Sequence, residues 1–575
     1  MAFKIKNYKL LLALILLFAL VIRLSGINTV LFFEESEWGM FAQNHDFTNL
    51  GLMFTLKSGP PVLWPHNPLV PLLFKLATIN TTDPVSMTSA LRIVPLIFGM
   101  ATITLLYFMT RKFYGQRTAL ITTALMAISY WHLLASLVVD IDGAILTFFL
   151  TLMTYAFLLY EEKNEKKYLA IAGIAFGVSL LAKFAGFLIL PIIFIYILTR
   201  PVSSANKGSI AQRFVRAIKI TVPMFIIGLA VFSIFPISAL LINNPQLFLY
   251  SIEHSGSYTG FKPTLRPIMV TFVFGTPLFI LLSIASIKNW KYSKNLFFLL
   301  YIFYFLFMYS FFLGSLDTES TYEKYLMISI PAMTLLSADF ISRIKFTTMK
   351  KKLLVFSTAV FFAAIFLMNI TNAPYIDHSV PDYQNRAIHG FFSPNAWDFS
   401  VPLMANVQPG FWMNFYSLAA ITVMSVLLFA VAGLFAFMHK TERSKMFLIL
   451  FIAAGLALNI FYVQEFLIHG THPDINKITY EMADYYNQNY SDRPLYANEM
   501  TLAFYTWKND NFFVGADDDR KDQALLAKQA GAVMLVTEYY PNIHKDSQAW
   551  KNINTCRLEK EFSDKGIIVG RIFVC

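Results

Sequence analysis

The sequence predicts a mainly α-helical protein that crosses a membrane many times and ends in a small α/β domain. Of the 575 residues, 56% are hydrophobic and only 14% are charged, whereas soluble domains carry about a quarter charged residues. Apolar segments of about 20 residues, the length that an α-helix needs to cross ~30 Å of hydrocarbon, recur along most of the chain. After about residue 464 the pattern becomes that of a soluble domain.

Thirteen segments have the length and apolarity of a membrane-spanning helix. They are, approximately, residues 10–30, 86–109, 118–138, 143–160, 168–182, 184–199, 220–242, 268–287, 296–314, 325–342, 353–371, 415–438 and 446–464. The first segment has the basic start of a secretory signal peptide. No small-x-small cleavage site follows it, so we favour an uncleaved helix.

The distribution of Lys and Arg predicts the orientation of these spans. Basic residues such as Arg111, Lys219 and Lys350 concentrate in alternate connecting segments, and these segments are cytoplasmic by the positive-inside rule. The N-terminus is then cytoplasmic and the C-terminal domain extracytoplasmic, in a multi-pass protein of the plasma membrane. The net charge of +11 is explained by this topology, so we expect no nucleic-acid partner.

The predicted topology divides the chain into two domains. Residues 1–464 form the transmembrane domain, whose largest outer loop covers residues 31–85. Residues 465–575 alternate amphipathic helices with short strands such as AVMLVTE and GIIVGRIFVC, and they predict an extracytoplasmic α/β domain.

Both cysteines of the chain, Cys556 and Cys575, lie in this outer domain. The sequence between them predicts a hairpin that turns at residues 563–566 and brings the two thiols near each other. A disulfide is therefore expected in an oxidising compartment, with two free thiols as the alternative.

The first outer loop begins with an acidic stretch, LFFEESEWGMFAQN. If residues 34–44 are helical, Glu34, Trp38 and Phe41 lie on one side, which suits a helix at the membrane interface. The alternative explanation is that acids favour a helix N-terminus because of the helix dipole. Glu37 is expected only to solvate the helix.

Further charged residues are predicted at the outer ends of the spans. Cations occur there at Arg92, Lys183 and Lys324, and acids occur in the VVDIDG stretch. Each residue alone is explained by solvation at the interface, where charge is inexpensive. The three cations together lie at the depth where a lipid-linked phosphate would bind.

The ordered set of motifs resembles a known family. It comprises the acidic pair after the first span, HNPL in the first loop, an Arg opening the second span, the DxD of VDIDG, GVSLLAK and KYLMISIP. The set resembles the GT-C membrane glycosyltransferases, in particular the bacterial and archaeal relatives of protein O-mannosyltransferases and lipid A aminoarabinose transferases. The resemblance covers roughly residues 10–345.

The resemblance implies a chemistry and a set of site residues. Glu34 and Glu35 match the acidic pair of the family, of which the first is the general base and is usually Asp. The implied donor is a polyprenyl-phosphate sugar, and the acceptor is a hydroxyl of a protein or a glycolipid. A carboxylate would deprotonate the acceptor, cationic and phenolic donors would stabilise the phosphate, and one displacement inverts the anomeric centre. The expected substrate-binding residues are His66, Arg92, Asp142, Lys183, Tyr322, Lys324 and Tyr325.

A divalent metal is an open alternative. Asp140 and Asp142 together with Glu34 would offer the oxygen ligands that Mg²⁺ or Mn²⁺ prefers. The resemblance implies that no metal is required. His469 and His472 in HGTH suit zinc, but we favour a solvated linker leaving the membrane.

Two other functions compete with sugar transfer. A transporter or flippase of lipid-linked glycans would carry charges or Gly/Pro breaks at mid-membrane in repeated halves, whereas the acids here cluster at the outer ends of spans. A membrane scaffold would leave these acids without a purpose.

Overall fold

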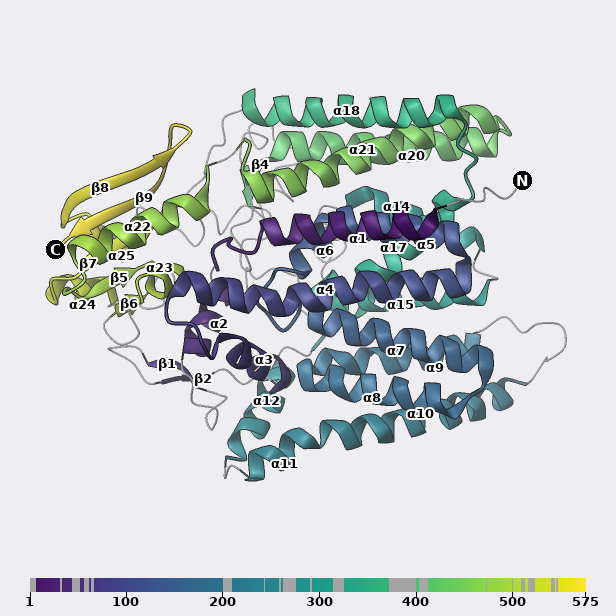
Figure 1. Cartoon of the computed structure of the whole chain (residues 1–575), viewed down its shortest axis with the longest axis horizontal. Helices are drawn as coiled ribbons and strands as arrows, with labels where there is room; N and C mark the ends of the chain where they lie inside the picture. The colour runs from purple at the N-terminus through teal and green to yellow at the C-terminus, as the bar shows by residue number, and fades with distance from the viewer. Residues whose placement is uncertain are drawn as a thin grey trace.

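The chain forms an elongated helical bundle with a small α/β domain at one end (Figure 1). The structure is a computed structural model. It describes residues 7–31, 34–43, 52–55, 61–63, 67–199, 209–241, 244–257, 260–261, 276–289, 292–313, 325–371, 400–402, 412–471, 473–498, 500–507, 512–514, 523–538, 543 and 547–575.

The helices of the bundle follow the predicted apolar segments. They are α1 (Tyr8–Ser25), α4 (Pro84–Tyr114), α5 (Gln116–Ile128), α6 (Tyr130–Ala135), α7 (Ala144–Lys163), α8 (Lys166–Ala182), η1 (Phe184–Leu188), α9 (Ile189–Thr199), α10 (Ile210–Phe232), α11 (Ile234–Leu241), α14 (Thr276–Ala285), η2 (Ser286–Asn289), α15 (Ser293–Phe311), η3 (Met327–Ser329), α17 (Ile330–Ser342), α18 (Thr348–Thr371), α20 (Phe415–Phe437) and α21 (Thr441–Ile468).

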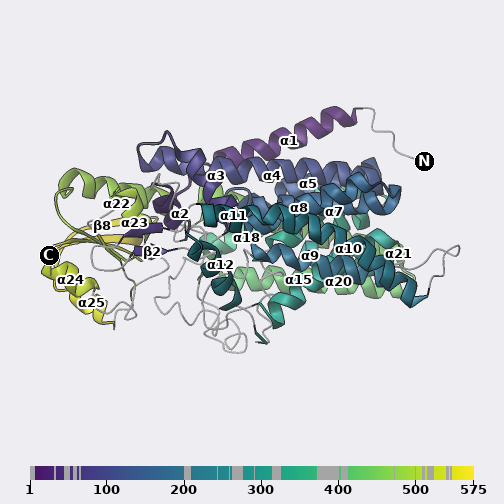
Figure 2. The ribbon, with the colours of Figure 1, turned by 90° about the horizontal axis from the view of Figure 1, so that it is seen from below.

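The outer elements lie at one end of the bundle. They are α2 (Glu34–Gln43), the strands β1 (Leu52–Thr55) and β2 (Pro61–Leu63), α3 (Leu69–Thr78), α12 (Gln246–Ser257), and the strands β3 (Ser400–Pro402) and β4 (Trp412–Asn414). Figures 1 and 2 place α2 and α3 next to the α/β domain, which is the end where the first outer loop is expected.

Eight helices in the described part of the chain are long and apolar enough to cross a membrane. Shorter apolar helices occupy other predicted spans, for example Phe184–Thr199 and Met327–Ser342. The polytopic helical bundle is confirmed, whereas the count of thirteen spans is not. One predicted span, residues 118–138, is broken at Ser129, whose hydroxyl accepts a hydrogen bond from the His132 N–H and starts α6.

The break between α5 and α6 is stabilised by a buried arginine of α1. The Arg23 guanidinium donates to the carbonyl oxygens of Met126 and Ala127 and to Ser136 Oγ. It also contacts His132 Nδ1 at 2.9 Å. Because a guanidinium only donates, Nδ1 accepts and the proton of a neutral His132 is on Nε2. Arg23 thus satisfies carbonyls that the end of α5 leaves without helical partners.

The outer domain contains a five-stranded mixed sheet in the order β6-β5-β7-β9-β8, with β5, β6 and β7 parallel and the other pairs antiparallel. Its elements are α22 (Ile475–Asn489), β5 (Leu495–Ala497), α23 (Met500–Tyr505), β6 (Phe512–Val514), α24 (Gln523–Gln529), β7 (Val533–Thr537), α25 (Gln548–Ile553), β8 (Arg557–Asp564) and β9 (Ile567–Val574).

Alternate residues of β7 serve two different cores. Val533 and Leu535 face α22, α23 and the first outer loop, while Met534 and Val536 face α24 and α25. This is the period-2 alternation of a strand. The first of these cores also contains Trp38 of α2, so one hydrophobic core joins the sheet to the transmembrane domain.

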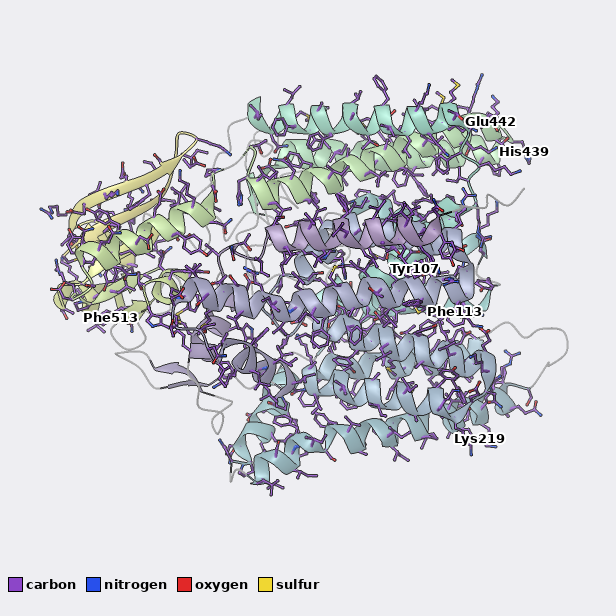
Figure 3. All side chains as sticks on the ribbon, viewed as in Figure 1. Tyr107, Phe113, Lys219, His439, Glu442 and Phe513 are labelled. Carbon is purple, nitrogen blue, oxygen red and sulfur yellow. A yellow bond between two sulfur atoms is a disulfide. The ribbon has the colours of Figure 1, made fainter. Side chains whose placement is uncertain are left out.

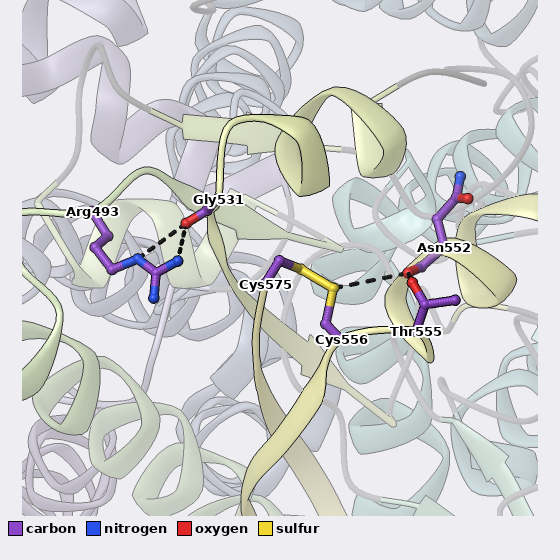
Figure 4. The surroundings of a disulfide bond; sticks show 6 residues. All are labelled: Arg493, Gly531, Asn552, Thr555, Cys556 and Cys575. Carbon is purple, nitrogen blue, oxygen red and sulfur yellow. Dashed lines mark hydrogen bonds between the residues drawn. A yellow bond between two sulfur atoms is a disulfide. The ribbon is translucent and has the colours of Figure 1, made fainter.

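The expected disulfide is present. Strands β8 and β9 form the predicted hairpin, whose turn residues Lys565 and Gly566 both have positive φ, as a two-residue hairpin turn requires. Cys556 and Cys575 lie at the open end of the hairpin and are bonded (Figure 4). The alternative of two free thiols is wrong.

The α/β domain and the connecting segments of Lys219 and Glu442 lie at opposite ends of the bundle. Both residues lie at the end opposite Phe513 of the outer domain (Figure 3). Which end is cytoplasmic stays a prediction.

Candidate active site

Helix α2 begins at Glu34, within the stretch predicted to be helical. Trp38 and Phe41 are buried on the same side of α2, and the Trp38 ring meets Phe74 of α3 edge to face at 5.6 Å between centroids. These aromatic residues therefore anchor α2 between other elements, whereas the sequence placed them at the membrane interface. The Glu34 side chain lies outside the described part of the structure, so its predicted role as a base is not tested.

The second acid of the pair, Glu35, forms a buried ion pair with Arg92. The distances are 2.9 Å from Nη1 to Oε1 and 3.2 Å from Nη2 to Oε2, and both side chains are fully buried. Oε1 also accepts the backbone N–H of Val139 at 2.8 Å. A base must offer a lone pair to the acceptor, so this internally bonded carboxylate is the weaker candidate of the two.

Arg92 binds groups of the protein itself in this structure. Besides Glu35, its guanidinium donates to the carbonyl oxygens of Thr29, Val30 and Leu137. Each of the five N–H groups of an arginine thus has an acceptor within the protein. In this structure Arg92 holds the backbone around the acidic pair, and its predicted contact with the donor phosphate stays a prediction.

Three of the predicted substrate-binding residues meet at the outer end of the bundle. Lys183 Nζ lies 2.5 Å from both carboxylate oxygens of Asp142 and 4.5 Å from the centre of the Tyr325 ring. The Tyr325 ring in turn stacks on Tyr309, with 5.5 Å between centroids and 4° between planes. We call Asp142, Lys183, Tyr309 and Tyr325 the Lys183 cluster.

Local structure explains why Lys183 reaches this position. It ends α8 in an extended conformation, before η1 begins. The turn is tight, since a Cβ on Gly186 would lie 2.5 Å from Ser179 Oγ. The Lys183 side chain retains 23% of its exposure. It is therefore the cation of the described cluster that a ligand can approach.

The first outer loop is attached beside the Lys183 cluster. Asn67 of the HNPL turn is buried, and its amide donates to the carbonyl oxygen of Leu180 near the end of α8. His66 precedes Asn67 in the sequence but lies outside the described residues, as do Tyr322 and Lys324. Their predicted positions in the site are therefore untested.

A metal site is not evident in the described residues, which contain no group of three His, Cys, Asp or Glu side chains able to hold an ion. Both Asp142 oxygens contact Lys183, and Asp140 Oδ1 accepts the Ile141 N–H. The predicted metal site of Asp140, Asp142 and Glu34 stays untested, because the Glu34 side chain lies outside the described part of the structure.

His469 is buried and contacts Asn476 at 2.8 Å, so it is not the solvated residue expected. His472 lies outside the described residues.

The residues that attach the outer domain to the segment before α2 were not predicted from the sequence. Val30 N–H donates to Asn476 Oδ1 at 2.9 Å, and Leu31 N–H donates to Tyr505 Oη at 2.7 Å. These partners are hundreds of residues apart, and no local pattern marks them. The role of Arg23 was not predicted either, although a lone arginine inside an apolar span indicates a buried polar contact within the bundle.

Comparison with known proteins supports the fold. Residues 66–237 match the family model described as dolichyl-phosphate-mannose-protein mannosyltransferase, and no curated protein matches the chain. ArnT from Cupriavidus metallidurans superposes with a TM-score of 0.57 in its apo state, at 14% identity over 97% of each chain. Its complex with undecaprenyl phosphate gives 0.58, at 13% identity over 97% of each chain.

A second solved structure is similar at a lower score. The oligosaccharyltransferase of Archaeoglobus fulgidus has a TM-score of 0.47, at 12% identity over 93% of this chain and 69% of that one. The likeness to ArnT over nearly the whole length shows the fold, so the chain has the GT-C fold of membrane glycosyltransferases that its sequence predicted.

Proposed function

We propose that this protein is a membrane glycosyltransferase that moves a sugar from a polyprenyl-phosphate donor to the hydroxyl of a protein or glycolipid. The observation that carries the proposal is the Lys183 cluster, which lies beside the attachment of the first outer loop. That loop also bears α2 and its acidic pair. The acidic pair of α2 and the Lys183 ammonium thus lie at the same end of the bundle. The solved complex of ArnT with undecaprenyl phosphate supports a lipid phosphate as part of the donor.

In the proposed reaction, Glu34 is the general base. The acceptor oxygen attacks the anomeric carbon while its proton passes to the carboxylate. The bond from that carbon to the phosphate oxygen breaks, and the polyprenyl phosphate leaves from the opposite face with inversion. Glu35 fixes the start of α2 through its ion pair with Arg92. This pairing holds the backbone of Glu34 in a constant position relative to the acceptor.

The phosphate requires cationic and hydrogen-bonding partners as it leaves. Lys183 supplies a cation that is held, before the donor arrives, by Asp142 and the Tyr325 ring. Donor binding replaces part of the contact with Asp142 by a contact with phosphate, which keeps the ammonium paired. His66, Tyr322 and Lys324 complete the proposed phosphate site. We propose that no divalent metal is needed, because the ammonium neutralises the leaving group.

The test is a transfer assay with a matched pair of variants. Purified protein in nanodiscs is given a panel of polyprenyl-phosphate sugars, and release of polyprenyl phosphate is followed with peptide or glycolipid acceptors. Lys183→Ala should reduce turnover by at least tenfold. Lys112→Ala should not, because Lys112 pairs with Glu162 at 2.7 Å on helix ends remote from the outer domain. Equal turnover in both variants contradicts the assignment of Lys183.

The same preparation separates transfer from lipid transport. In sealed liposomes, a flippase moves the lipid-linked sugar between leaflets without releasing polyprenyl phosphate. Movement without release, with every donor and acceptor tested, would replace our proposal with the transport function.

A further inference from the structure

The chain segment of residues 28–31 leads directly to the acidic pair, and the outer domain holds it from one side. The Tyr480 hydroxyl donates to the carbonyl oxygen of Asn28 at 3.2 Å. As described above, Asn476 and Tyr505 accept the N–H groups of Val30 and Leu31. Three side chains of α22 and α23 thus bind the backbone within four residues.

The transmembrane domain holds the same segment from the other side. Arg92 Nε donates to the carbonyl oxygen of Thr29 at 3.0 Å, and Nη2 donates to that of Val30 at 2.7 Å. Each residue from 28 to 31 therefore has a backbone group bound by a side chain of α4 or of the outer domain.

Tyr505 connects the two sides through one chain of hydrogen bonds. Thr88 Oγ1 lies 2.7 Å from the carbonyl oxygen of Pro84. It also lies 2.8 Å from Tyr505 Oη, in a hydrogen bond in which either hydroxyl can donate. A lone pair of the Tyr505 hydroxyl accepts the Leu31 N–H. The phenol therefore bridges the first outer loop and the start of α4.

Helix α2 packs closely against α23 of the outer domain. Phe504 lies against Gly39 of α2, where an added Cβ would be 2.6 Å from the phenyl ring. Phe504 and Tyr505 are both buried, in the core that they share with Trp38. Asn476 also contacts His469 at the end of α21, so the contact extends to the last helix of the bundle.

From this geometry we infer that the outer domain positions the general base, and that Tyr505 and Asn476 are its positioning residues. The inference rests on the proposed function, in which Glu34 acts three residues after Leu31. A displacement of about 1 Å in a reacting group costs up to about 10²-fold in rate. The hydrogen bonds that hold residues 28–31 come from α4, α22 and α23, and none comes from a residue of the Lys183 cluster. A change in the position of the base should therefore lower the rate of transfer without weakening donor binding.

The experiment compares two tyrosines of the outer domain in the full-length protein in nanodiscs. Tyr505→Phe removes the hydroxyl that accepts the Leu31 N–H. Tyr486→Phe is the matched control, because Tyr486 is also buried and its hydroxyl donates at 2.6 Å to the carbonyl oxygen of Arg493, within the same domain. Both variants lose one buried hydroxyl, and only the first loses contact with the segment that leads to α2.

Two readouts are taken from each variant. We expect Tyr505→Phe to lower kcat by about 10- to 100-fold, with the KM for the donor within about twofold of wild type, and to speed hydrogen exchange of residues 28–31 severalfold. Tyr486→Phe should leave kcat and this exchange unchanged. Asn476→Asp, which keeps an acceptor for Val30 N–H, should retain more activity than Asn476→Leu.

The outcomes are distinct. Equal kcat and equal exchange in the two tyrosine variants would overturn the inference. If the wild-type protein transfers no sugar from any donor, the proposed function fails. Hydrogen exchange then still tells whether Tyr505 holds the segment of residues 28–31.

Discussion

Arg92 and Glu35 face each other across two hydrogen bonds, with both side chains excluded from solvent. The guanidinium also binds three backbone carbonyl oxygens from two separate chain segments, and the carboxylate binds the Val139 N–H. A buried pair with further hydrogen bonds satisfies both charges. This pair therefore joins α2, α4 and the segment that follows α6, and it is central to the geometry of the proposed site.

Removing one member of this pair should be costly. Arg92→Met leaves the Glu35 carboxylate buried without its counter-ion, and loss of one partner of a buried pair costs about 3–5 kcal/mol. We expect a large fall in the free energy of unfolding, measured by thermal or denaturant unfolding in detergent. The control is Lys445→Ala, which breaks an exposed pair with Glu442 and should cost less than about 1 kcal/mol. Similar losses in the two variants would show that the buried pair is not structural.

The general base is tested by Glu34→Gln, which keeps the shape of the side chain and removes its basicity. Sugar transfer should fall by at least the 10²- to 10⁴-fold that general bases contribute, while expression and thermal stability stay near wild type. Glu37→Gln, on the same helix, should keep most activity. Near-normal transfer by Glu34→Gln would remove it from the mechanism.

Metal independence is tested by chelation. Because Lys183 contacts both Asp142 oxygens, we expect transfer to survive prolonged EDTA treatment and dialysis, with activity within about twofold of the untreated protein. Loss of activity that added Mg²⁺ or Mn²⁺ restores would favour an oxygen site that includes Glu34.

Acid should weaken the start of α4. Asp83 caps this helix, and hydrogen bonds from the Ser86 hydroxyl and then the Ser86 backbone N–H hold the pKa of its carboxyl below the ordinary value. A lowered folded-state pKa means that the cap contributes stability above the unfolded pKa of about 3.9. This contribution is lost as pH falls through the folded pKa.

The measurement compares Asp83→Ala with wild type at several pH values. The substitution should cost about 1 kcal/mol near pH 7, and the difference in unfolding free energy should shrink below about pH 4. A difference that stays constant with pH would contradict a role for the ionised carboxylate.

Much of the architecture follows from local patterns. Apolar segments of spanning length predicted the bundle, alternation of hydrophobic residues predicted the outer sheet, and the turn at residues 563–566 predicted the hairpin and its disulfide. The family resemblance placed Asp142, Lys183 and Tyr325 among the expected substrate-binding residues, and in the structure Lys183 contacts both of the others. In each case the signal lies in neighbouring residues or in the topology of the spans.

Other features depended on packing between distant parts of the chain. The partner of Arg92 is 57 positions away, and that of Leu31 is 474 positions away. Hydropathy places a charged residue at the membrane surface, but it does not tell whether that residue meets a ligand or a buried carboxylate. The composition and periodicity of the chain thus determined a polytopic bundle with an outer domain. The tertiary structure alone decided that Arg92 supports the acidic pair and that the outer domain holds the segment before α2, because hydrogen bonds between distant residues form only once the helices have packed.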